Sequence, residues 1–109
     1  MAEPTLTAVF GANATQTSTT ITISKADLPG LTASANNTAE SLLVGLVLLA
    51  KQSLSQTNFD ANLNQSIYVD NGFPTFTFRG TNNDSYRVDQ LTINLAKPDT
   101  AGTIDPDDY

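Results

Sequence analysis

The densest group of side chains in this sequence that could support chemistry is a set of carboxylates near the C-terminal end. Asp105, Asp107 and Asp108 follow one another closely there. Hard cations such as Ca²⁺ take about six to eight oxygen ligands, held by a loop of fixed geometry. Nothing in this segment fixes such a geometry, so we expect a solvated acidic tail, with a metal site as the weaker alternative.

Four further aspartates, Asp60, Asp70, Asp84 and Asp89, could include a catalytic pair. Two carboxylates act as acid and base when their surroundings push their pKa values apart. Asp70 and Asp84 stand in Asn- and Gly-rich stretches where aspartate is a turn former, and Asp89 lies at an irregularity in a strand pattern. We therefore expect none of the four to be catalytic.

Other reactive groups are scarce. The chain has no histidine and no cysteine, which removes the commonest general base, the commonest transition-metal ligand and the thiol nucleophile. No Gly-x-Ser-x-Gly elbow and no Gly-rich phosphate loop occurs. The sequence therefore predicts a protein that is not an enzyme and has no catalytic, cofactor-binding or metal-binding residue.

The charge balance excludes further classes of partner. Eleven acidic and five basic residues give a formal net charge of −6. Nucleic acids and anionic membranes are bound through clustered lysine and arginine, so we expect neither partner. The apolar run from Leu42 to Ala50 is closed by Glu40 and Lys51 and is shorter than the about 20 residues that span a bilayer. The first residues have no basic and apolar leader, so we expect a cytoplasmic setting.

The first half of the chain predicts two strands and one helix. Residues 5–10 and 19–24 alternate between apolar and polar residues, as strands do. A linker, 25–37, leads to a helix from residue 38 to about 56, with Asn37 as N-cap and Glu40 at the spacing of a capping box. Residues 58–64 read as a polar connection.

The second half predicts three strands, at 66–69, 74–79 and 86–96. Asp70-Asn71-Gly72 predicts a hairpin turn between the first two, because Asn-Gly readily supplies positive φ. The apolar residues of the last strand change phase between Val88 and Leu91, so we expect a β-bulge near Asp89-Gln90, or else a strand whose covered face changes.

These elements predict an α+β protein: an antiparallel sheet of about five strands with one apolar helix packed on it, in the order ββαβββ. Residues 1–96 form the single domain. Residues 97–109 form an acidic tail that we expect to be ordered only against a partner, such as a neighbouring copy.

The helix carries more apolar surface than one core face needs. Its broad arc is predicted to be core and comprises Leu42, Leu43, Leu46, Val47, Leu49, Ala50 and Leu54. Val44 and Leu48 lie outside that arc as a second strip. Either the linker 25–37 covers this strip, or another subunit does.

Two aromatic residues, Tyr68 and Phe73, flank the predicted turn at 70–72. Exposed aromatics at such a place could bind sugar rings. Packing at a turn or a sheet edge is the simpler interpretation.

In size, acidic balance, Thr- and Asn-rich strands and lack of Cys and His, the chain resembles small virion structural proteins of tailed bacteriophages, such as capsid cement or decoration proteins and tail or neck accessory proteins. The resemblance lies in composition and identifies no functional residue. It implies a non-enzymatic assembly protein in a virion, assembled in the host cytoplasm, a homo-oligomer that binds itself or other virion proteins. The alternative is a small ligand- or carbohydrate-binding module of a bacterial cell. The residues that we expect at subunit contacts are Val44, Leu48, Lys97, Pro98, Ile104 and Tyr109.

Overall fold

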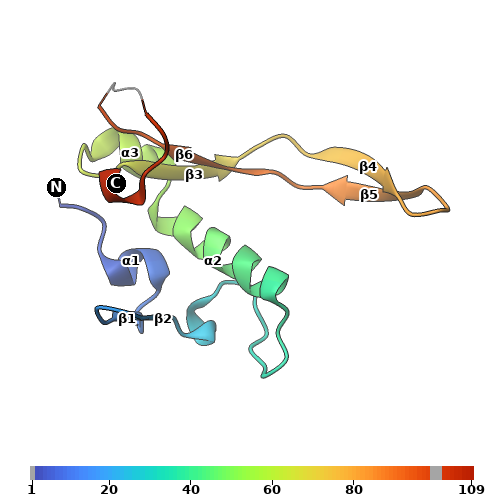
Figure 1. Ribbon diagram of the computed structural model, residues 1–109, viewed down its shortest axis with the longest axis horizontal. Coiled ribbons are helices and arrows are strands. Elements are labelled where there is room, and N and C mark those ends of the chain that lie inside the picture. The colour runs from blue at the N-terminus through green and yellow to red at the C-terminus, as the bar shows by residue number, and fades with distance from the viewer. Residues whose placement is uncertain (1, 99–101) are drawn as a thin grey trace.

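The computed structural model describes residues 2–98 and 102–109. It consists of a small body, which holds the helices, and a long projecting arm, residues 73–89 (Figure 1). Its principal extents are 51 × 36 × 26 Å and its radius of gyration is 16.6 Å. A compact chain of this length has a radius of gyration of about 13 Å. The excess comes from a two-stranded ribbon that extends away from the helices.

The predicted strand at 5–10 is wrong, because this segment is the short helix α1 (Leu6–Phe10). The Thr5 side chain accepts a hydrogen bond from the Ala8 amide, and the helix ends at Gly11, where φ is 104°. A strand needs a neighbour for its backbone groups, whereas this one turn satisfies part of them internally. α1 packs against the long helix α2 (Ala39–Ser53).

The predicted strand at 19–24 shrinks to two residues. β1 (Thr15–Gln16) pairs antiparallel with β2 (Ile21–Thr22), and both strands are exposed. A 3₁₀ turn, η1 (Lys25–Asp27), follows. The Asp27 carboxylate accepts hydrogen bonds from the backbone and side chain of Asn13, which ties the small hairpin to this turn.

α2 begins one residue later than the sequence predicted. Its N-cap is Thr38, whose hydroxyl accepts from the Ser41 amide at 3.1 Å. Asn37, the predicted cap, instead bonds the Ser34 amide and the Thr32 carbonyl and so closes the preceding loop.

The long helix also ends earlier than predicted. It stops at Ser53, and Ser55 caps a separate helix, α3 (Gln56–Ala61), that the sequence reading had treated as helix end and polar connection. The Ser55 hydroxyl accepts from the Asn58 amide at 3.1 Å. The chain therefore changes direction before the first long strand.

The four remaining strands form one ribbon with a single reversal. β3 (Ile67–Asn71) pairs with β6 (Leu91–Leu95), and β4 (Thr75–Arg79) pairs with β5 (Asp84–Val88), both antiparallel. The predicted hairpin turn at 70–72 is therefore wrong: the chain runs on from β3 into β4. It reverses at residues 80–83, where Gly80 and Asn83 have φ of 82° and 52°.

Gly72 has another role than a turn. A Cβ atom there would lie 2.6 Å from Gln90 Cγ, so glycine lets the two strands approach. The Gly72 amide donates to the Gln90 carbonyl at 2.7 Å, and the Phe73 amide donates to Gln90 Oε1 at 3.0 Å.

The ladder is irregular at Asp89-Gln90, but the β-bulge expected in that strand is not what the register shows. Asn71 pairs with Leu91 and Thr75 pairs with Val88, so residues 72–74 face only residues 89–90. The extra residue thus lies in the segment 72–74, between β3 and β4. This one-residue mismatch shifts the phase of one strand relative to the other between the body and the arm.

The class α+β with antiparallel strands and an apolar helix is confirmed, but a five-stranded sheet is not what the described residues form. Their strands pair two by two, as β1-β2, β3-β6 and β4-β5. Among the described residues no helix is long and apolar enough to cross a membrane.

The core is small and lies where α2 meets β3. The buried apolar residues are Ala14, Leu28, Leu49, Leu54 and Val69. The Val69 amide donates to the Leu54 carbonyl at 2.8 Å, which fixes the strand to the end of α2. Leu43, predicted to be core, is 60% exposed. The apolar arc of the helix is thus only partly covered.

Candidate functional site

The described acidic residues of the tail lie in and beside a 3₁₀ turn. Asp105 caps the 3₁₀ turn η2 (Pro106–Asp108) by accepting from the Asp107 amide at 3.0 Å. Asp108 pairs with Lys97, with Nζ and Oδ2 3.2 Å apart. Among the described residues no group of three His, Cys, Asp or Glu side chains could hold a metal ion.

Of the other four candidate aspartates, three lie in or beside the strands, and Asp60 lines a hollow with Phe59 and Leu63. Asp89 accepts from Arg87 Nε at 2.8 Å, Asp70 accepts from the Asn71 amide, and Asp84 stands opposite Arg79 in the register of the arm. These contacts stabilise strands and their ends.

The strip of Val44 and Leu48 is half covered: the linker provides part of a cover, and cover by another subunit stays a prediction. Leu28 of the linker is buried against Gly45 of α2. A Cβ atom added at residue 45 would lie 3.1 Å from Leu28 Cβ. Val44 is nevertheless 55% exposed and Leu48 is half-buried. With Pro29 and Leu31 they line an open hollow of about 310 Å³.

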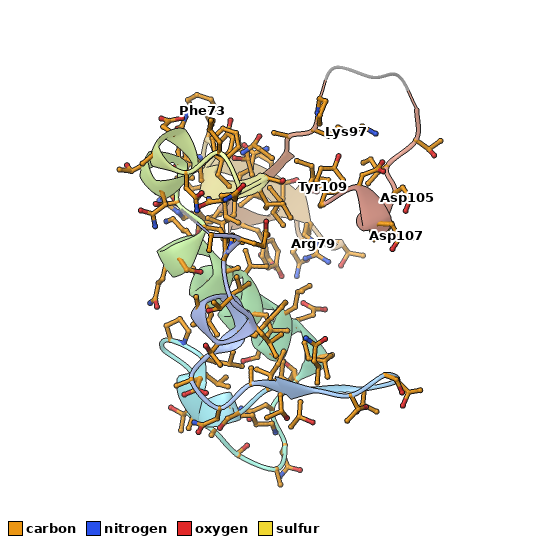
Figure 2. The ribbon with its side chains drawn as sticks, turned by 90° about the vertical axis from the view of Figure 1, so that its left-hand side faces the viewer. Phe73, Arg79, Lys97, Asp105, Asp107 and Tyr109 are labelled. Carbon is orange, nitrogen blue, oxygen red and sulfur yellow. The ribbon has the colours of Figure 1, made fainter. Side chains whose placement is uncertain are left out.

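The C-terminal segment lies against the body of its own chain and encloses an apolar groove with it. We call this cavity, of about 610 Å³, the terminal groove. Its apolar lining includes Val9, Phe10, Ile67, Leu95, Ile104 and Tyr109. Figure 2 looks onto this end of the molecule: Tyr109 lies on the side of the tail toward the strands, and Asp105 and Asp107 lie toward the outside.

The structure thus places the six predicted contact residues at three hollows, two of which adjoin because Gln65 and Ser66 line both. Val44 and Leu48 lie beside the linker. Lys97 and Pro98 line a hollow of about 360 Å³ with Phe59 and Leu63. Ile104 and Tyr109 line the terminal groove.

The two aromatics that suggested a sugar-binding platform are not flanking a turn. Tyr68 is half-buried in β3 and its ring lies 4.8 Å from that of Phe59 in α3. Phe73 is 84% exposed at the junction of body and arm. Tyr68 thus packs against a helix.

The surface that sequence reasoning missed is the arm, which we define as residues 73–89. Phe76 and Phe78 alternate with threonines along β4, a pattern that favours a core-facing position for both rings, yet each residue is 68% exposed. They share one face of the β4-β5 ribbon with Ser85 and Arg87. The alternation of phenylalanine and threonine along the sequence does indicate that the two rings share a face. It does not indicate whether anything covers that face.

The opposite face of the arm is also partly apolar. Tyr86 and Val88 lie there with Thr75 and Thr77, and both apolar side chains are exposed. Arg79 lies over the Tyr86 ring, 5.1 Å from its centroid. In the described chain, no element packs extensively against β4 or β5 except the other strand of the pair.

No protein-family model, no curated protein and no solved structure matches this chain. The arm and the terminal groove therefore have to be interpreted from their own chemistry.

Proposed function

We propose that this protein is a non-enzymatic structural protein that works by assembling with other subunits, chiefly copies of itself, as a component of a phage virion. The observation that carries the proposal is the arm, which projects from the body with Phe76 and Phe78 about two-thirds exposed (Figure 1). The composition of the chain supports the virion setting.

A free arm of this type is physically unfavourable. An isolated two-stranded hairpin is only marginally stable in water, and it gains stability when a further layer covers it. Contiguous exposed apolar side chains on a soluble protein generally mark interaction sites. Both arguments favour a partner that covers the arm.

The energy available to such a contact follows from the exposed area. A phenylalanine side chain buries roughly 200 Å² when fully covered, so a ring that is 68% exposed can still lose about 140 Å². At about 25 cal/mol per Å² this amounts to roughly 3 kcal/mol for each ring. That equals a factor on the order of 100 in a dissociation constant.

The test is the mass of the protein in solution, measured by size-exclusion chromatography with light scattering over a concentration series to about 1 mM. The wild type should associate, and Phe76→Ser with Phe78→Ser should be monomeric. Thr75→Ser with Thr77→Ser is the matched control, because it alters the same strand on its other face. A wild-type chain that stays monomeric throughout would contradict the proposal.

A further inference from the structure

We infer that the arm of one copy docks in the terminal groove of the next copy, so that the subunits join head to tail. This inference rests on the proposed function and deepens it, because it names the surface that receives the arm. Three observations carry it: the size and lining of the groove, the placement of the two surfaces and the distribution of charge.

The groove fits the side chains that the arm presents. A cavity of roughly 150 Å³ is enough for one benzene ring, and the terminal groove measures about 610 Å³. It can therefore take both Phe76 and Phe78, which lie two residues apart on one face. Its walls are apolar at Val9, Leu95 and Ile104, so they match the rings chemically.

The arm and the groove lie at opposite ends of the molecule. In Figure 1 the β4-β5 ribbon reaches out on one side, while α1, the tail and the outer ends of β3 and β6 gather on the other side. An arm cannot fold back into the groove of its own chain. A contact between two different patches is heterologous, and such contacts build rings or filaments.

Charge favours this pairing over contacts between two bodies. The arm holds two arginines and two aspartates, so it carries no net charge, and the whole −6 belongs to the rest of the chain. Glu3 lines the groove, and Asp105 and Asp107 lie on the tail beside it (Figure 2). Two acidic bodies repel each other, whereas an arm without net charge can approach the acidic end.

The experiment uses one variant for each surface of the full chain. Phe76→Ser with Phe78→Ser removes the rings of the arm, and Ile104→Asp places a charge in the groove. Ile104 is exposed, so its replacement should leave the fold intact, which far-UV circular dichroism checks. Thr103→Asp is the matched control, since it adds the same charge next to the groove. Tyr109→Asp is the second groove variant if Ile104→Asp fails to fold.

The arm variant loses both rings and should be monomeric, with a dissociation constant raised on the order of 10⁴-fold. The groove variant should also be monomeric, and the Thr103 control should associate like the wild type. A mixture of the arm variant with the groove variant has one intact arm and one intact groove, so it should form dimers that grow no further. Light scattering then reports twice the monomer mass.

Two results would overturn the inference while leaving the proposed function intact. In the first, the groove variants still associate and only the arm variant does not, which would show that arms pair with each other or with another surface. In the second, both variants are monomeric but their mixture forms no dimer. A monomeric wild type, by contrast, would contradict the proposed function itself.

Discussion

Removing the arm should leave the body folded and should not lower its stability. The variant replaces residues 73–89 by a two-residue Asn-Gly turn. The last backbone hydrogen bond of the body before the arm runs from the Gly72 amide to the Gln90 carbonyl, with 2.7 Å between nitrogen and oxygen. A two-residue turn closes such a pair directly. β3 and β6 then form an ordinary hairpin on α2.

The expected change in the free energy of unfolding is between zero and a gain of about 2 kcal/mol. The arm contributes no buried side chain, and its own pairing is worth little in water. The connection between Gly72 and Gln90 shortens from 17 residues to two, which is about three halvings of a loop. Each halving removes roughly 0.6 kcal/mol of closure cost.

Urea unfolding followed by far-UV circular dichroism measures this change. A control variant keeps the 17-residue length but has an unpaired Gly-Ser sequence in place of the arm. It should be less stable than the Asn-Gly variant by roughly 2 kcal/mol, because only the loop length differs. If the Asn-Gly variant lost more than about 1 kcal/mol relative to wild type, the arm would belong to the cooperative core, and the reasoning above would be refuted.

Three further predictions concern the helix α2 and are read out by thermal or urea unfolding. Leu49→Ala should lower the free energy of unfolding by about 3 kcal/mol, because Leu49 is buried. Leu43→Ala, at an exposed site, should change it by less than about 0.5 kcal/mol. Equal effects of the two substitutions would contradict the observed helix face. Gly45→Ala should destabilise the protein by about 1 kcal/mol. Its new Cβ would lie 3.1 Å from Leu28 Cβ, and this crowding should outweigh the gain of about 1 kcal/mol in helix propensity. A more stable variant would show that Leu28 moves aside. Thr38→Ala should cost about 1 kcal/mol by removing the N-cap, and no loss would mean that Asn37 caps instead.

The aromatic pair of the arm illustrates how far strand periodicity reaches. The alternation of Phe76 and Phe78 with Thr75 and Thr77 correctly predicted a strand and two faces. It did not predict that the Phe face would be open to solvent. Burial depends on what packs above a face, and that contact comes from residues far away in sequence.

The prediction of a hairpin turn at 70–72 was wrong for a related reason. Asn71-Gly72 is a strong local signal for a two-residue hairpin, but local preference is weak against a longer ladder. By continuing into β4, the chain gains the pairing of β3 with β6 and of β4 with β5. The glycine then serves the close approach of Gln90.

The strand at 5–10 shows a third limit. Six residues of alternating pattern fit either a strand or one helical turn. Thr5 supplied a helix cap and Gly11 a helix end, both of which are visible in the sequence. The absence of a neighbouring strand, which is a tertiary fact, decided between them.

The sequence by itself determined the class of the protein, the place of its long helix, three strands at 66–69, 74–79 and 86–96, the last of which the structure divides into β5 and β6, and the lack of histidine and cysteine chemistry. These follow from composition and from periodicity along the chain, which act over short distances. Only the tertiary structure decided which strands pair, which apolar faces are covered and where the tail lies. Those outcomes depend on contacts between distant segments, and they leave Phe76, Phe78 and the terminal groove as the surfaces from which we infer assembly.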